Sequence, residues 1–239
     1  MSVKSQQEKI FKRRICKNIS LRYLLFLPKG YAEDSEKRWP LILFLHGAGE
    51  RGNDLRRVAR HGPSKMVEQR PEFPFVVVSP QCPAGQIWDC DAVMALLDDL
   101  LRKFRVDRRR VYLTGLSMGG YGSWELALRY PERFAAVAPI CGGGNAILVM
   151  LPSGRSCAAI RKLPVWAFHG AKDELVNVEE SQRMVNALLA IGNQARLTIY
   201  PEAGHDCWSV PYAGTELYDW FLEHKARALK NNRARDAIR

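Results

Sequence analysis

Seven short apolar runs recur along the chain, and segments with a helical spacing of apolar residues separate most of them. The runs are nearly continuous in apolar character and rich in β-branched and aromatic residues, which is typical of strands covered on both faces in a parallel sheet. They cover residues 21–28, 41–47, 75–80, 110–115, 134–140, 165–170 and 196–201. We therefore expect strands that alternate with helices.

Four other segments carry the spacing of a helix. In the segment 91–104, apolar side chains recur at three- and four-residue intervals, an aspartate stands near the start and basic residues stand at the end, as the helix dipole favours. The segment 178–192 repeats this spacing and stops at a glycine. Further helices are expected over residues 118–130 and about 213–229. This alternation predicts one open α/β domain with right-handed crossovers.

The positive charge of the chain is concentrated at its two ends. Of a formal net charge of +11, residues 1–17 and residues 225–239 each contribute +5, which leaves residues 18–224 nearly neutral. Basic ends of this kind are typical of solvated tails. The remaining basic cluster, at residues 102–110, has aspartates beside it and is typical of an exposed helix end and turn. We therefore predict a basic extension at 1–17, one globular domain at 18–229 and a basic tail at 230–239, with no nucleic-acid partner.

Membrane and redox signals are weak. A long uncharged span, residues 134–154, is interrupted by prolines and glycines, so it predicts a strand leading into a loop rather than a membrane-spanning helix. The six cysteines form no C-x-x-C pair, and no secretory signal pattern is found, so we expect reduced thiols in a cytoplasmic protein. A disulfide between Cys82 and Cys90 stays open as the alternative if the chain is exported.

The stretch "VYLTGLSMGGYGSW", residues 111–124, sets one serine between two glycines where a predicted strand meets a predicted helix. An abrupt strand-to-helix turn forces the residue at the join into a strained backbone conformation, and Gly115 and Gly119 remove side chains that would collide there. The hydroxyl of Ser117 is then exposed above the sheet. This is the arrangement expected of a nucleophile elbow.

A base and an acid for this serine follow in the chain. Asp173 comes after the run at 165–170, and His205 comes after the run at 196–201, so both are expected at the carboxyl edge of the sheet together with Ser117. A serine hydroxyl needs a basic imidazole to become nucleophilic, and the imidazole needs a carboxylate to orient it. The order serine, aspartate, histidine is that of the α/β-hydrolase fold.

A glycine-rich loop supplies the remaining part. The segment "HGAGERG", residues 46–52, leaves an earlier predicted strand and lets backbone amides approach a substrate closely. We expect the backbone N–H groups of Ala48 and Met118 to form the oxyanion hole.

Together these segments resemble the α/β-hydrolase superfamily, and more narrowly the serine carboxylesterases and predicted peptidases related to feruloyl and polyhydroxybutyrate esterases. The resemblance covers about residues 20–224 and is most specific in "LHGAGERGND", "TGLSMGGYGSWELALRYPERFAAVAPICGG", "VWAFHGAKDELVNVEES" and "GHDCW". It implies an α/β-hydrolase fold with a mostly parallel central sheet flanked by helices, and ester hydrolysis through an acyl-enzyme. Ala48 stands where lipases and larger esterases often carry a third glycine, which favours the small-esterase branch. Val176 and Asn177 stand where many relatives carry a proline.

Several other residues could compete for these roles. His46 and His169 each end a predicted strand before a glycine, and we expect both to be buried structural histidines. Glu174 and Asp206 are alternatives for the acid, although Asp206 adjoins His205 and would reach its ring poorly.

The expected cleft is open. The segment between the runs at 134–140 and 165–170 leaves room for little or no cap domain, which favours small or extended substrates. Trp208, Trp88 and Tyr121 are the aromatic residues that we expect to contact substrate.

The sequence thus predicts a serine esterase that hydrolyses short-chain or aromatic carboxylic esters, with a small-molecule ester as its partner and no metal or other cofactor. Two alternatives remain: a serine peptidase of the same fold, because the same groups cleave amides, and a basic binding protein that uses its charged tails.

Overall fold

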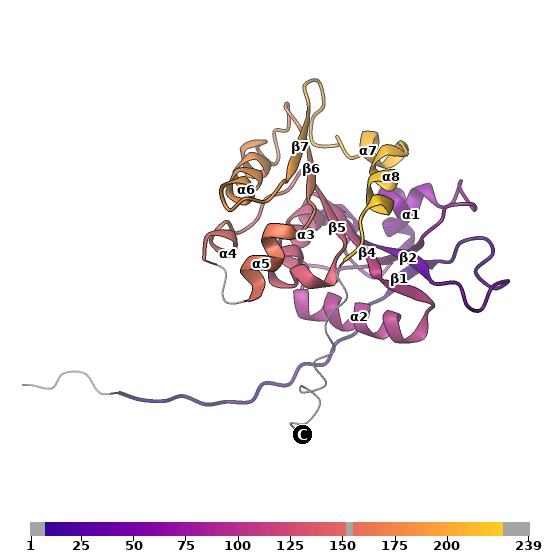
Figure 1. The fold of residues 1–239 in the computed structure, drawn as a ribbon, viewed down its shortest axis with the longest axis horizontal. Coiled ribbons are helices and arrows are strands. Elements are labelled where there is room, and N and C mark those ends of the chain that lie inside the picture. The colour runs from indigo at the N-terminus through magenta and orange to yellow at the C-terminus, as the bar shows by residue number, and fades with distance from the viewer. Residues whose placement is uncertain (1–7, 152–154, 227–239) are drawn as a thin grey trace, which may run out of the picture.

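The computed structural model describes residues 8–151 and 155–226, which form a seven-stranded sheet with helices on both faces (Figure 1). The strands lie in the order β1-β3-β2-β4-β5-β6-β7. Strand β1 pairs antiparallel with β3, and every other pair is parallel. The strands are β1 (Tyr23–Phe26), β2 (Trp39–Leu45), β3 (Val76–Pro80), β4 (Val106–Leu116), β5 (Ala136–Ile140), β6 (Trp166–Gly170) and β7 (Arg196–Tyr200). The sequence-based prediction of seven strands in a mostly parallel sheet is confirmed.

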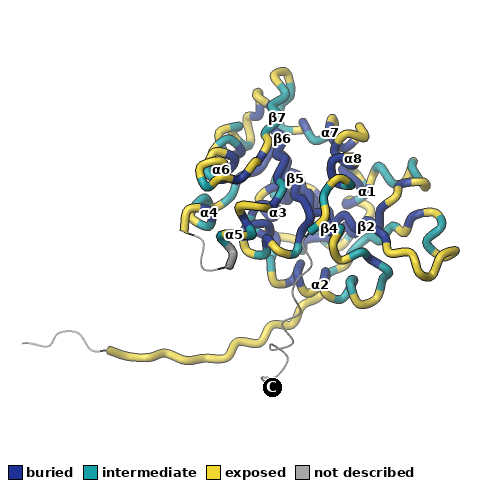
Figure 2. The backbone as a smooth tube through the Cα atoms, viewed as in Figure 1, coloured by how far each residue is buried: buried dark blue, intermediate teal, exposed yellow. Residues whose placement is uncertain are grey.

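Alternate residues of the central strands point into two separate cores. On β2, Leu41, Leu43 and Leu45 face one core, while Ile42 and Phe44 face the other, and all five are fully buried. Burial on both faces is the reason that these strands read as continuous apolar runs. Figure 2 shows the buried strands enclosed by helices that are exposed on their outer sides.

The helices divide between the two faces. The longer helices α2 (Cys90–Lys103), α3 (Met118–Arg129) and α6 (Glu179–Ala190) pack on one core, and α8 (Glu216–Glu223) packs on the other. Shorter helices are α1 (Gly62–Met66), α4 (Ile147–Met150), α5 (Arg155–Lys162) and α7 (Ser209–Ala213), with 3-10 turns η1 (Ala48–Glu50), η2 (Leu55–Arg60) and η3 (Pro131–Arg133). In the described part of the connection from β5 to β6 only α4 and α5 occur, and this matches the expectation of little or no cap.

The helix expected over 213–229 is wrong in its extent. The chain instead forms α7, breaks at Gly214 and forms α8, which ends at Glu223. After α8 the backbone becomes extended, and the N–H of Ala226 donates to the carbonyl of Arg109 at 2.7 Å. This contact with β4 takes the backbone groups that a longer helix would need.

Strand β4 begins four residues earlier than predicted. Its register with β2 jumps between Trp39 and Leu41, so that residues 107–110 bulge out of the ladder. The Asp107 carboxylate accepts hydrogen bonds from the backbone N–H of Arg109 and the guanidinium of Arg110. Local hydrogen bonds of the Asp107 side chain therefore stabilise the bulge at 107–110, a segment whose polar sequence is typical of a turn.

The described part of the N-terminal extension lies outside the fold. Residues 8–20 are exposed and run away from the sheet as coil (Figure 2). An ion pair joins Lys17 to Asp89, the residue that caps the N-terminus of α2. The predicted tail at 230–239 lies outside the described residues.

Within the described ranges, none of the helices has the length and apolar character that crossing a bilayer requires. Each of the six cysteines is a free thiol in this structure, so Cys82 and Cys90 are not paired.

Candidate active site

Ser117 stands at the turn from β4 into α3 and has the backbone angles φ 54° and ψ −119°. A positive φ is a strained conformation for a residue other than glycine. The surrounding backbone leaves no alternative: a side chain on Gly119 would overlap the Leu45 carbonyl and lie 2.8 Å from the His46 oxygen. The N–H of Ser117 is held by the carbonyl of Ile140 at 3.0 Å. The elbow predicted from the two glycines is therefore present.

The three predicted triad side chains lie in one hydrogen-bonded chain. The Oγ of Ser117 lies 2.9 Å from Nε2 of His205, and Nδ1 of His205 lies 2.8 Å from Oδ2 of Asp173. They come from the carboxyl ends of β4, β6 and β7, since Asp173 follows β6 and His205 follows β7. Parallel strands bring these ends to one edge of the sheet.

Asp173 is oriented by its own loop. Its Oδ1 accepts hydrogen bonds from the backbone N–H groups of Leu175 and Val176, each at 2.9 Å, and its side chain is fully buried. Burial raises the pKa of Asp173, but the hydrogen bonds from Val176, His205 and Leu175 together outweigh this effect, and the net pKa lies below its usual value. Asp173 is therefore an ionised acceptor for the imidazole of His205 at neutral pH.

The alternative acids are not part of this chain of hydrogen bonds. Glu174 and Asp206 are both exposed, whereas Asp173 is buried against the ring of His205. A second histidine also reaches the acid, because Nε2 of His169 donates to the Val176 carbonyl at 2.8 Å and lies 3.2 Å from Oδ2 of Asp173. His169 is fully buried, as predicted, and it ties the acid loop to β6.

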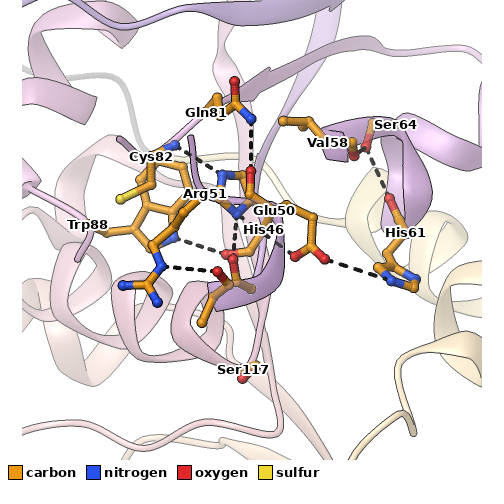
Figure 3. Close-up of polar contacts among 12 residues, drawn as sticks. His46, Glu50, Arg51, Val58, His61, Ser64, Gln81, Cys82, Trp88 and Ser117 are labelled. Atoms are coloured by element: carbon orange, nitrogen blue, oxygen red, sulfur yellow. Dashed lines mark hydrogen bonds and ion pairs between the residues drawn. The ribbon is translucent and has the colours of Figure 1, made fainter. Parts of the chain in front are cut away.

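The glycine-rich loop after β2 runs directly against the elbow. A side chain on Gly47 would lie 2.9 Å from the Leu116 side chain, so the loop approaches the end of β4 at van der Waals distance. Ala48 is exposed at the start of η1, and Met118 is the first residue of α3, where backbone N–H groups have no acceptor within the helix. Figure 3 shows the η1 turn above Ser117.

A set of polar contacts fixes this loop in position (Figure 3). The amide of Gln81 donates to the carbonyls of Glu50 and Asp54, each at 2.8 Å. The guanidinium of Arg51 donates to the carbonyl of Ala48 at 3.0 Å and to that of Gln86 at 3.2 Å. Residues 46–54 are therefore anchored to the connection between β3 and α2. We call this segment the oxyanion loop after the role predicted for Ala48 from the sequence.

His46 has a structural role at the base of the oxyanion loop. Its Nδ1–H donates to the Gly47 carbonyl at 2.6 Å, and its Nε2 accepts the N–H of Cys82 at 3.0 Å, which assigns the neutral tautomer with the proton on Nδ1. Burial lowers the pKa of His46, and this effect exceeds the opposing hydrogen bond to Gly47 and the nearby Glu50. The expectation of a buried structural histidine agrees with this environment.

The three aromatic residues expected in the cleft have different positions. The ring of Trp208 lies edge-on to that of His205, with centroids 5.3 Å apart, and Tyr121 is exposed one turn after Ser117. Trp88 is buried instead, and its indole N–H donates to the His46 carbonyl at 3.1 Å. The predicted substrate contact of Trp88 is therefore corrected to a structural role behind the oxyanion loop.

Two residues at the edge of the site, His61 and Glu50, were not predicted from the sequence. The ring of His61 lies against that of Trp208 with centroids 5.6 Å apart, and its Nε2 lies 3.8 Å from the buried carboxylate of Glu50. Glu50 belongs to the glycine-rich motif, and its position between two glycines could have indicated that its carboxylate lies near the site. His61 had no such signal, because its partners are distant in sequence.

A buried thiol also borders the triad. Cys141 has φ 40°, is fully buried, and its Sγ lies within 4.8 Å of donor atoms of Asp173 and His205. These three side chains are a possible ligand set for a metal ion, but Asp173 and His205 already bond to each other and to Ser117. The chemistry open to the arrangement is activation of a hydroxyl by an oriented imidazole.

Comparison with known proteins identifies the family. A family model described as Phospholipase/Carboxylesterase matches residues 89–213, and one described as Esterase PHB depolymerase matches residues 21–147. The chain belongs to the α/β-hydrolase esterases. The predicted resemblance is confirmed, and the two matches together cover the oxyanion loop, the elbow and the loops of Asp173 and His205.

Individual relatives of this esterase chain are more distant. It is 29% identical over 163 residues to the "Bifunctional acetylxylan esterase/xylanase XynS20E" of Neocallimastix patriciarum, covering 65% of this chain and 22% of that protein. It is 32% identical over 176 residues to the "Probable feruloyl esterase C" of Aspergillus terreus, covering 69% and 59%. The chain thus spans less than two thirds of the length of these relatives.

Among solved structures, a thermostable esterase superposes with a TM-score of 0.72 at 33% identity, over 86% of this chain and 59% of that one. A ferulic acid esterase superposes with a TM-score of 0.64 at 22% identity, over 82% and 89%. The second likeness bears on the fold alone.

Proposed function

We propose that this chain is a serine esterase that hydrolyses short-chain or aromatic carboxylic esters through an acyl-enzyme intermediate. One observation carries the proposal: the unbroken hydrogen-bonded chain from the Ser117 hydroxyl through His205 to the ionised Asp173. Membership of an esterase family supports it independently.

In the proposed reaction, Ser117 attacks the ester carbonyl while Nε2 of His205 accepts the serine proton. Asp173 holds the proton on Nδ1 and stabilises the imidazolium that forms. The backbone N–H groups of Ala48 and Met118 donate to the oxyanion of the tetrahedral intermediate. His205 then returns the proton to the leaving alcohol, and a water molecule repeats the sequence to release the acid. None of these steps calls for a metal or other cofactor.

The substrate class rests on two supports. With only α4 and α5 described between β5 and β6, no large cap restricts the cleft, and the Trp208 ring beside His205 offers an aromatic surface. The names of two relatives, an acetylxylan esterase and a feruloyl esterase, refer to a short acyl group and an aromatic acyl group. The free thiols of all six cysteines fit a cytoplasmic site of action, which is part of the same proposal.

Active-site labelling tests the nucleophile. A fluorophosphonate probe should modify Ser117, as mapped by peptide mass spectrometry, and Ser117→Ala should lower kcat for 4-nitrophenyl acetate by about a thousandfold or more. Ser35→Ala, at an exposed turn between β1 and β2, is the matched control and should match wild type. Labelling of another residue, or more than a tenth of wild-type activity in Ser117→Ala, would exclude the proposed mechanism.

A peptide 4-nitroanilide in the same assay separates the esterase from the peptidase of the same fold. We expect kcat/KM for the ester to exceed that for the anilide by at least about a hundredfold, beyond their difference in intrinsic reactivity. Equal efficiency toward the two would favour the peptidase.

A further inference from the structure

A groove of about 300 Å³ opens beside the catalytic edge, between α1 and α7. Its apolar floor includes Met66, Trp208 and Tyr212, and its polar rim includes His61, Lys65 and Arg70. The mechanism proposed above uses none of the rim residues.

One indole ring separates this groove from the proposed general base. Trp208 lines the groove and also lies edge-on to His205, with centroids 5.3 Å apart and planes at 87°. His61 packs on the same indole at 5.6 Å and is backed by Glu50. The Trp208 ring forms the wall between the groove and the site, and contacts with His205 and His61 fix its position.

The position of the groove indicates which half of an ester it would accept. His205 must return its proton to the leaving oxygen, so that oxygen lies next to Nε2 in the reacting complex. The alcohol portion then extends past the imidazole and over Trp208, while the acyl portion stays on Ser117.

The charge of the groove indicates what that alcohol portion carries. Its lining residues, all within the described chain, include the cations Lys65 and Arg70 and no carboxylate. The Arg70 guanidinium is fixed by a hydrogen bond to the Ala213 carbonyl at 2.7 Å, and Lys65 is exposed and free to reach a ligand. Glu68, on the same segment, lines a different pocket, and the Glu50 carboxylate contacts His61 from behind.

We propose that the groove is the alcohol subsite of the enzyme and selects esters whose alcohol portion carries an anionic group beyond an apolar or aromatic body. The inference rests on the proposed esterase function. Trp208 and Met66 contact the apolar body, and Lys65 and Arg70 attract the anion, which is a carboxylate or a phosphate.

The test uses acetate esters that share one acyl group and differ only in the charge of the alcohol portion. 4-Acetoxybenzoate and 3-(4-acetoxyphenyl)propanoate place a carboxylate at two reaches, 4-acetoxyphenyl phosphate carries a phosphate, and the two carboxamides are neutral controls. Each kcat/KM is divided by the rate constant for hydroxide-catalysed hydrolysis of the same ester. We expect the corrected kcat/KM of at least one anionic ester to exceed that of the neutral carboxamides by about fivefold. Whether a carboxylate or the phosphate is favoured then shows which anion the groove binds.

Lys65→Gln should lower that preference by about three- to fivefold, and Lys65→Glu should remove or invert it. Raising the salt concentration should weaken the preference in the wild type. Lys162→Gln is the matched control, because Lys162 is an exposed lysine on α5, far from α1 in Figure 1, and it should behave as wild type.

The proposed subsite would be wrong if the wild type showed no preference for anionic esters. It would also be wrong if wild type, Lys65→Gln and Lys65→Glu showed the same preference. Either result would leave the proposed esterase function unaffected. If the wild type hydrolysed none of the acetate esters, including the neutral ones, the proposed esterase function itself would be wrong. The two failures are therefore distinguishable in one set of assays.

Discussion

At the scale of single residues, the strained backbone of Ser117 is the main local cost of the site. A φ of 54° at a non-glycine residue costs on the order of 1–3 kcal/mol, and it persists because β4 and α3 determine the conformation from both sides. The neighbouring glycines let the end of β2 pass directly beneath the turn. The strain is what exposes the hydroxyl next to His205.

This packing predicts a large difference between two glycine substitutions. In Gly119→Ala the new methyl group would overlap the Leu45 carbonyl, so we expect a loss of more than about 3 kcal/mol in the free energy of unfolding. In Gly49→Ala the methyl group meets nothing within 4 Å, so the free energy should change by less than about 1 kcal/mol. Chemical denaturation of both variants measures the difference, and equal stability of the two would contradict the described elbow.

At the scale of elements, the oxyanion loop differs from the strands and helices that surround it. Hydrogen bonds from Gln81 and Trp88 to carbonyls of the loop, and from the loop's own Arg51 to the Gln86 carbonyl, hold it in position. Polar anchoring gives defined directions to the backbone N–H groups, which is what stabilisation of an oxyanion requires. It also makes the loop sensitive to the protonation state of His46.

The lowered pKa of His46 predicts a loss of stability in mild acid. The folded protein keeps this ring neutral, whereas the unfolded chain takes up a proton below about pH 6.5, so the unfolded state binds more protons there. Stability should therefore fall as the pH drops through about 6.5, by about 1 kcal/mol between pH 7.5 and 5.5. Denaturation at both pH values measures this change.

His46→Gln removes the titrating ring but keeps hydrogen-bonding groups, so its stability should fall by less than that of the wild type over the same range. An identical pH dependence in His46→Gln and wild type would show that the loop does not depend on a neutral histidine.

At the scale of the whole molecule, the basic extension is separate from the hydrolase fold. Residues 8–20 are exposed, and the ion pair between Lys17 and the half-buried Asp89 lies at the surface, where such pairs are worth less than about 1 kcal/mol. The edge of the sheet that carries Ser117, Asp173 and His205 is built entirely from residues after β1. We therefore propose that the extension is a separate segment rather than part of the esterase domain.

Removal of residues 1–17 should leave kcat/KM for 4-nitrophenyl acetate within about twofold of wild type and lower the free energy of unfolding by less than about 1 kcal/mol. The steady-state assay and chemical denaturation of the shortened chain measure both quantities. A folded but inactive shortened chain would instead favour a function that depends on the basic extension.

The sequence by itself determined the elements and the type of site. The seven strands and the helices α2, α3 and α6 follow from the spacing of apolar residues, because burial on one or two faces acts within a few residues of chain. The elbow at Ser117 was predictable for the same reason, since the steric need for glycine at 115 and 119 is local. The order of Asp173 and His205 after successive strands then predicted a meeting at one edge of the sheet.

Only the tertiary structure decided which neighbours these residues have. The choice of Asp173 over Glu174 and Asp206 as the partner of His205, the burial of Trp88 and the end of α8 at Glu223 depend on segments that are far apart in the chain. The groove beside Trp208 is formed in the same way, from α1 and α7, which are more than a hundred residues apart in the sequence. The local sequence pattern does not predict such contacts, because the relative positions of these residues are set by the packing of whole helices and strands on the two faces of the sheet.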